Sequence, residues 1–499
     1  MQTIPRNSLF DHTMTNIFIR SSFALLLVGT FTPTLAVAQE KPATSYNVLF
    51  IAIDDLNDWV GCLGGNPQVK TPNLDRFARE GGIVFTKAYC PSTVCCPSRT
   101  ALLTGKNAAN TGVYGNKQNL KLAPKAKDVE TLPEYFGNRG YHTLSAGKIF
   151  HKHGPKKGDK DEGQWAFHEH VHPGGKNQGL VWEEEPKVEG VQSGGTKFAW
   201  GATKVPTEET KDYVACKWAA DQFDRDFDGK PFFLALGISK PHLPWYVPQE
   251  FFDLYPLDEV SPAPFVRNDL DDITKKNGQP IFSPGSRFRL ADETKMHAQA
   301  NRAYLANVSY VDHCVGKTLD ALAKSKYADN TIVMIWGDHG WHLGEKLQYG
   351  KTNLWEESAR VPFIVKAPGS ELKNAKCDRV VNLIDMYPTL VDLCGLPANK
   401  NNDGRSFAPL LQNPSQEWKF PALTTYQYKN HSITDGHYRY TWYGGRADAE
   451  ELYDHETDPL EHKNLVANAD YAEIIARLKQ HLPEHNEPDS PSNDAPNSK

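Results

Sequence analysis

A nucleophilic side chain stands at the start of the run Cys95-Cys96-Pro97-Ser98-Arg99. Pro97 fixes its own φ and Ser98 is a good N-cap, so the sequence predicts a helix that begins directly after Ser98 and carries Ala101, Leu102 and Leu103. The positive end of that helix would point back at Cys95 and favour an anion there. The alternative is that Cys95 is a small buried hydrophobe, which is the usual role of a free cysteine.

Two pairs of polar residues could hold a cation. Asp54-Asp55 ends one apolar run and Asp338-His339 follows another. Either pair alone could form a solvated turn. Together at one sheet edge, the three carboxylates would repel one another, and their pKa values would rise unless a cation lay between them. Oxygen ligands of this kind favour a hard divalent ion, Ca²⁺ in preference to Mg²⁺.

Lysines and histidines in short motifs could neutralise an anionic substrate. Each is ordinary alone, because a surface lysine is more often solvated than functional. Their coincidence with strand ends and with the cysteine run favours an anion site made by Lys148, His151, Lys240, His242 and Lys351.

Three apolar runs would position these residues: Asn47–Asp54, Phe232–Ile238 and Thr331–Gly337. Unbroken apolar runs are typical of parallel strands that are covered on both faces. Helical patterns lie between them, notably over residues 291–324, where apolar residues recur at spacings of three and four. The alternation predicts an α/β fold with the polar residues gathered at the carboxyl edge of an open sheet.

With these residues in view, the string C-x-P-S-R followed by x-x-x-x-T-G resembles the signature of the type I sulfatases. Stretches such as Gly337–Glu345 and Leu354–Pro362 are similar to the iduronate-2-sulfatase-like branch, over about Tyr46 to Leu478. The resemblance implies an alkaline-phosphatase-like fold. This fold has a large mixed, mostly parallel sheet flanked by helices, and a smaller C-terminal α+β subdomain with an antiparallel sheet and one helix.

The resemblance also implies hydrolysis of sulfate esters by a formylglycine, the aldehyde formed from the signature cysteine after translation. The matching residue is Cys95 and not Cys96, since only Cys95 stands two residues before Pro97. The metal ligands would be Asp54, Asp55, Cys95, Asp338 and His339. One hydroxyl of the hydrated aldehyde would attack sulfur, and the other would then expel sulfate.

The remaining roles are implied in the same way. Lys148, Lys351 and Lys240 would bind the sulfuryl oxygens. His242 would also contact substrate and would protonate the departing sugar oxygen. His151 would help to deprotonate the second hydroxyl, and Arg99 would hold the hydrate and the metal-side geometry.

One stretch departs from the branch. Relatives often carry Asn-His, a short apolar pair and then Arg, placed to meet an anionic substrate group, whereas Asn430–Thr434 has Thr434 at the place of that Arg. Recognition of a uronic acid carboxylate, as in a 2-O-sulfated uronic acid, is therefore open. Two other functions also stay open: a phosphonate or phosphate ester hydrolase of the same superfamily, and a non-catalytic sulfated-glycan binding protein if Cys95 is never modified.

The ends of the chain suggest where the protein works. Residues 1–38 resemble a secretory signal peptide, with Met1 or Met14 as the start, so we expect a secreted or periplasmic protein. Without them, 53 basic residues stand against 60 acidic ones, a net charge near −7, which argues against a nucleic-acid partner. The expected partners are a sulfated carbohydrate and a formylglycine-generating or other sulfatase-maturing enzyme, with no membrane span in the mature chain.

The domain boundaries that we predict are 46–412 for the catalytic domain and 418–482 for the C-terminal subdomain. Residues 483–499, which are rich in Pro, Asn, Asp and Ser, are predicted to be a disordered tail. The 8 cysteines show neither a zinc-binding spacing nor the density of a disulfide scaffold.

Overall fold

A computed structural model describes residues 46–151, 163–176, 179–186, 197–275, 277–445 and 447–493. The predicted signal peptide lies outside the described residues. The chain from Ala43 to Lys499 forms one compact unit, so the boundary between residues 46–412 and 418–482 remains a prediction. Among the helices of the described residues, none combines the length and the apolar character that crossing a bilayer requires.

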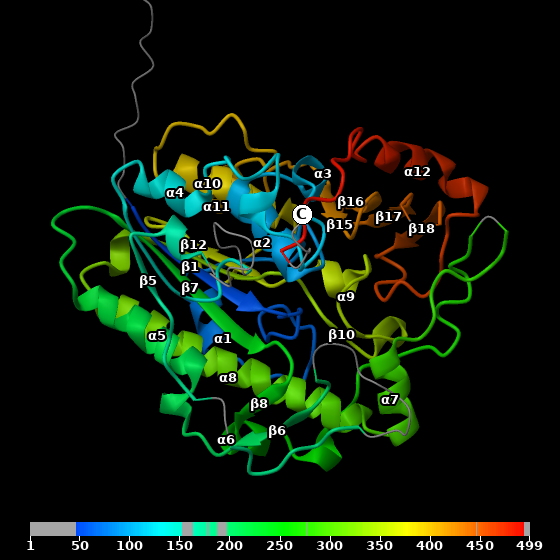
Figure 1. The fold of residues 1–499 in the computed structure, drawn as a ribbon, viewed down its shortest axis with the longest axis horizontal. Coiled ribbons are helices and arrows are strands. Elements are labelled where there is room, and N and C mark those ends of the chain that lie inside the picture. The colour runs from blue at the N-terminus through cyan, green and yellow to red at the C-terminus, as the bar shows by residue number, and fades with distance from the viewer. Residues whose placement is uncertain are drawn as a thin grey trace, which may run out of the picture. The chain divides into compact units, whose positions relative to one another are not determined.

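The centre of the fold is an eight-stranded sheet (Figure 1). Its strands follow the order β13-β2-β12-β9-β1-β7-β4-β5, and only β12 runs antiparallel to its neighbours. The predicted large, mixed and mostly parallel sheet is confirmed. The strands are β1 (Asn47–Asp54), β2 (Ile83–Phe85), β4 (His142–Gly147), β5 (Glu169–Val171), β7 (Phe232–Pro241), β9 (Thr331–Gly337), β12 (Phe363–Lys366) and β13 (Ala375–Cys377).

Helices cover both faces of this sheet, as the unbroken apolar strands require (Figure 1). Leu49 and Ile51 of β1 pack into one core, and Val48 and Phe50 of the same strand pack into another. The first core is formed with α1 (Pro72–Arg79), α5 (Lys211–Asp221), α6 (Gln249–Asp253), α7 (Ser286–Thr294) and α8 (His297–Lys324). The second is formed with α2 (Cys95–Thr104), α4 (Leu132–Gly137), α10 (Met386–Leu393) and α11 (Ala408–Gln412).

Short elements line the loops around the sheet. Three two-stranded pairs are formed by β3 (Ala88–Tyr89) with β14 (Val381–Asn382), β6 (Trp200–Thr203) with β8 (Trp245–Pro248), and β10 (His342–Leu343) with β11 (Tyr349–Gly350). Two one-turn helices are α3 (Ala108–Thr111) and α9 (Glu356–Ala359).

The C-terminal part is an antiparallel four-stranded sheet with one helix, as predicted. Its strands are β15 (Ala422–Thr425), β16 (Asn430–Thr434), β17 (Tyr438–Tyr443) and β18 (Ala449–Asp454). Leu478 of α12 (Ala472–Lys479) packs on Ile433, Tyr440 and Leu452 of this sheet.

The start of α2 differs from the prediction. The helix begins at Cys95 after the N-cap Val94, about one turn earlier than a helix capped by Ser98 would begin. Pro97 is tolerated because it lies in the first turn, where backbone amides have no partner within the helix. The Ser98 hydroxyl instead donates to the backbone oxygen of Asp338 at 2.6 Å, which ties α2 to the end of β9.

One predicted helix is divided in two. Residues 291–324 belong to two helices, α7 and α8, because Lys295 between them adopts a left-handed conformation with φ 59°.

Residues 483–493 belong to the predicted disordered tail, but the structure describes them as a segment packed against α3 and Gly112. The Glu487 amide donates to the Ala109 oxygen at 2.7 Å, and the Ser490 amide donates to the Gly112 oxygen at 2.8 Å. The polar composition of this segment offers no apolar face that would predict packing. Backbone hydrogen bonds to another part of the chain do not need an apolar face.

Candidate active site

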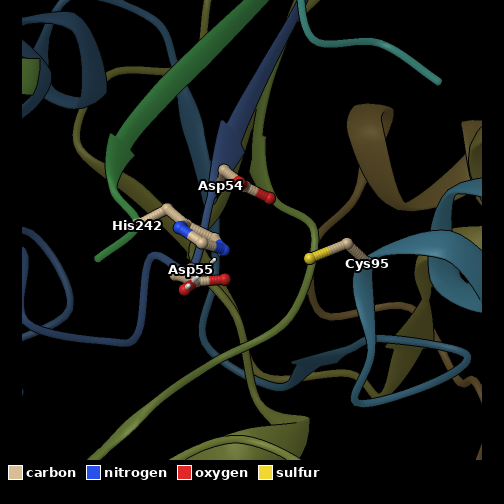
Figure 2. A group of neighbouring side chains, drawn as sticks. All are labelled: Asp54, Asp55, Cys95 and His242. Atoms are coloured by element: carbon tan, nitrogen blue, oxygen red, sulfur yellow. Dashed lines mark ion pairs between the residues drawn. The ribbon is translucent and has the colours of Figure 1, made fainter. Parts of the chain in front are cut away.

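The predicted polar edge forms at the carboxyl ends of adjacent parallel strands. Asp54 and Asp55 lie at the end of β1, Asp338 and His339 follow β9, and His242 follows β7. Figure 2 shows Cys95 at the start of α2 with its sulfur directed toward the two aspartates, and His242 close to Asp55. Because β7 and β9 flank β1, their ends bring these distant segments to one place.

Cys95 lies in a cationic environment. Its Sγ, which stands where the oxygens of a formylglycine would lie, is 2.9 Å from Lys351 Nζ and 3.2 Å from His339 Nε2. Burial opposes the thiolate, but Lys148, Lys351 and His339 prevail and lower the pKa of Cys95 to about 6. The pKa of Cys96 is raised, mainly by burial. Of these two cysteines, Cys95 is therefore the one whose surroundings stabilise a negative charge.

Arg99 connects the two acidic strand ends. Its side chain is fully buried, with Nε 2.8 Å from Asp338 Oδ2 and Nη2 3.3 Å from Asp54 Oδ1. Nη1 donates to the Ile149 backbone oxygen at 3.0 Å. These contacts fit the predicted role of Arg99 in securing the geometry around the carboxylates.

The carboxylates are suited to a divalent cation. Donor atoms within 4.8 Å of one another form two overlapping groups that share Asp54 and Cys95: one adds Asp55 and His242, the other Asp338 and His339. Asp55 Oδ2 is buried and has no hydrogen-bond partner among the described residues. Burial raises the pKa of Asp338 to about 6, whereas the burial of Asp54 and Asp55 is outweighed by neighbouring cations, which lower their pKa values. The five predicted ligands therefore fit a metal ion, and His242 is a neighbour that the sequence did not assign to it.

Two predicted anion-binding lysines reach this edge. Lys148 Nζ lies 2.6 Å from Asp54 Oδ2, and Lys351 Nζ lies 2.5 Å from Asp55 Oδ1. His151 is near them: burial and the Lys148 charge hold its pKa well below the usual range, so its imidazole is neutral. Its Nδ1 is buried and has no hydrogen-bond partner among the described residues.

His242 and Lys240 differ in what they face. The His242 ring is 30 % exposed, and its Nε2 lies 3.9 Å from Asp55 Oδ2. The Lys240 ammonium donates to the backbone oxygens of His242 and Pro244, and burial lowers its pKa to about 8. In this structure Lys240 therefore holds the loop that carries His242. Its contact with sulfate remains a prediction.

A cavity of about 440 Å³ adjoins the site and opens beside His242 and Lys351. Its wall also contains Arg287 and Trp341, which the sequence reasoning did not single out. Trp341 lies inside the motif Gly337–Glu345, so its position was available as a signal. Arg287 follows Gly285 at the start of α7 and belongs to none of the family stretches.

The departure at Thr434 lies in β16, beside β17. Thr434 pairs with Arg439, whose Nε lies 2.8 Å from Glu461 Oε1, and whose guanidinium also binds Glu356. His431 is buried, with Nε2 2.8 Å from Asn486 Oδ1. The side chains of Arg439 and His431 are thus bound to other residues of the protein.

The fold and this constellation define a sulfatase, and the family comparison agrees. The model of the sulfatase family matches residues 46–396, and a model named N-sulphoglucosamine sulphohydrolase, C-terminal, matches residues 337–488. The chain belongs to the sulfatase family and is a sulfuric ester hydrolase.

Its relatives include a sulfatase of Formosa agariphila, 38% identical over 90% of this chain and 88% of the relative. The iduronate 2-sulfatase of Mus musculus is 27% identical over 93% of this chain and 98% of its own length. The predicted resemblance to the type I sulfatases and to iduronate 2-sulfatase is confirmed.

Solved structures support the fold. A structure described as a complex with its substrate, D-glucosamine-2-N,6-O-disulfate, has a TM-score of 0.67 at 22% identity and covers 87% of this chain and 96% of that chain. The phosphonate monoester hydrolase of Silicibacter pomeroyi has a TM-score of 0.69 at 20% identity, with 87% and 94% covered.

Proposed function

We propose that this protein hydrolyses sulfate esters of a carbohydrate with a formylglycine formed from Cys95. The observation that carries the proposal is the position of Cys95, whose sulfur lies 2.9 Å from Lys351 and 3.2 Å from His339 beside three carboxylates. The glycan substrates named for its relatives support a sulfated sugar, including a 2-O-sulfated uronic acid.

Asp54, Asp55, Asp338, His339 and the residue at position 95 would hold the metal, which we propose to be Ca²⁺. The ion would supply positive charge for the sulfuryl oxygens, and the hydrated aldehyde would supply the nucleophilic oxygen. Lys148 and Lys351 neutralise further charge on sulfate from within the buried edge. His242, at the cavity side, donates a proton to the departing sugar oxygen.

His151 is neutral and can accept a proton from the second hydroxyl of the hydrate. The aldehyde requires a separate maturing enzyme, which would supply a two-electron oxidant that converts the Cys95 thiol to a thioaldehyde. Hydrolysis of the thioaldehyde would then release hydrogen sulfide and leave the aldehyde. We also propose that residues 1–38 direct the chain to secretion or to the periplasm, where a sulfated polysaccharide would be met.

Two measurements test the proposal. Peptide mass spectrometry over residues 93–99, on protein from its native source, should find an aldehyde at position 95. An intact thiol there would refute the proposed nucleophile. Sulfate release from defined sulfated oligosaccharides should exceed hydrolysis of a matched phosphonate monoester. The reverse preference would favour a phosphonate hydrolase.

A further inference from the structure

The cavity wall contains a cation that the chemistry at Cys95 does not use. Arg287, the second residue of α7, lines the cavity together with His242 and Lys351. Among the described residues that line it, these three can carry positive charge and none is Asp or Glu. A volume of about 440 Å³ is in the range of small-ligand sites. The composition therefore favours a ligand with more than one negative group.

The positive charges lie along one wall of the cavity. Lys351 Nζ contacts Cys95 Sγ at 2.9 Å, so its charge serves the reacting sulfate. A sulfate monoester carries a single negative charge, which Lys351, Lys148 and a metal ion held by the carboxylates would already neutralise. The guanidinium carbon of Arg287 and Lys351 Nζ each lie 5.7 Å from the ring centroid of Trp341, so the two cations share the cavity wall around this ring.

Arg287 is held by a rigid element. The Gly285 amide donates to the Leu347 oxygen at 2.9 Å, and the Arg289 amide donates to the Gly285 oxygen at 2.9 Å, which fixes the first turn of α7. Phe288 and Leu290 anchor the helix in the core. A side chain placed on a packed helix can select a ligand with little ordering cost.

We infer that Arg287 binds a second anionic group, a carboxylate or a second sulfate, on the sugar whose sulfate ester is cleaved. The guanidinium presents a planar pair of donors that matches either group. This inference rests on the proposed function, because only a sugar bound through its sulfate at Cys95 would place a second anion in the cavity.

The experiment compares substrates that differ only in the second anion. One pair is a 2-O-sulfated uronate disaccharide and its carboxyl-reduced form. The other is glucosamine 2-N,6-O-disulfate and glucosamine 6-O-sulfate, and 4-nitrophenyl sulfate serves as the common reference. The variants are Arg287→Met and Arg287→Lys. Arg289→Met is the matched control, since Arg289 lies on the same helix, is exposed and donates to the Pro284 oxygen.

In one of the two pairs, the wild-type enzyme should prefer the member that carries the second anionic group. A preference in the uronate pair would identify that group as a carboxylate, and a preference in the glucosamine pair would identify it as a sulfate. Arg287→Met should lose about 10- to 150-fold in kcat/KM on that member, the effect of one charge-assisted hydrogen-bonded contact. It should change little on 4-nitrophenyl sulfate, which also shows that the variant is folded. Arg287→Lys should recover part of the loss, and Arg289→Met should behave as wild type.

Three results would overturn the inference while the proposed function stands. The first is that the wild-type enzyme shows no preference for the doubly anionic member of either pair. The second is that Arg287→Met loses no kcat/KM on that member. The third is an equal loss of kcat/KM on all substrates, which would assign Arg287 to the metal side. A wild-type protein that hydrolyses no sulfate ester would instead overturn the proposed function, and the inference with it.

Discussion

The adjacent cysteines allow one sharp comparison, Cys95→Ala against Cys96→Ala. Both side chains are fully buried in the same helix, but only Cys95 Sγ contacts Lys351 and His339. Cys96 Sγ contacts the Gln118 backbone oxygen at 3.4 Å and packs in the core with Leu102 and Leu103. The two substitutions therefore remove similar volume from different environments.

Loss of the nucleophile at position 95 should reduce kcat by at least about 10⁴-fold. Cys96→Ala removes one buried sulfur atom and its weak hydrogen bonds, so it should lower the free energy of unfolding by about 1–2 kcal/mol and leave kcat near wild type. The assay is sulfate release from a sulfated oligosaccharide, with urea unfolding as the stability measurement and peptide mass spectrometry to record the aldehyde. Equal loss of activity in both variants would refute the assignment of the nucleophile to Cys95.

Three further predictions follow from the structure. His242→Ala should reduce turnover of a sugar sulfate by about 10²- to 10⁴-fold, but turnover of 4-nitrophenyl sulfate much less, because a phenolate leaves without a proton; equal losses would contradict its role as an acid. Arg99→Met should lower the free energy of unfolding by about 3–5 kcal/mol, because Asp54 and Asp338 lose their buried partner. Added Ca²⁺ should restore part of the free energy of unfolding that Arg99→Met loses. If Ca²⁺ stabilised the variant no more than the wild type, that result would argue against a metal at these carboxylates. Burial raises the pKa of Glu451 from 4.5 to about 8, so the folded state retains a proton that the unfolded chain releases. Its stabilising contribution is full below pH 4.5 and is lost as the pH rises to about 8, at up to about 1.4 kcal/mol per pH unit. Between pH 5 and 8, the free energy of unfolding measured in urea should therefore fall less steeply with pH for Glu451→Gln than for the wild type. Parallel curves of free energy against pH for the two proteins would be evidence against the raised pKa.

The strands and the reactive edge were predictable because their signals are local. Asn47–Asp54 and Thr331–Gly337 form strands with these bounds, since a strand buried on both faces needs an unbroken apolar run. Polar residues directly after such strands must lie at one edge when the strands are parallel. That is why Asp54, Asp55 and Asp338 could be placed together from the sequence.

Helix boundaries were harder to predict because neighbouring structure decides them. Ser98 has the composition of an N-cap, but its hydroxyl is used by the Asp338 backbone, and α2 starts at Cys95. The break at Lys295 needs a left-handed backbone that no glycine marks. In both cases tertiary contacts override local propensity.

The sequence by itself determined the family, the α/β class and the group of residues around Cys95, because these follow from residue order and strand character. Only the tertiary structure decided what surrounds that group. It directed Lys240 toward backbone oxygens, placed His242 near the carboxylates and brought Arg287 from α7 into the cavity. These positions depend on packing between segments far apart in the chain, for which no local pattern exists.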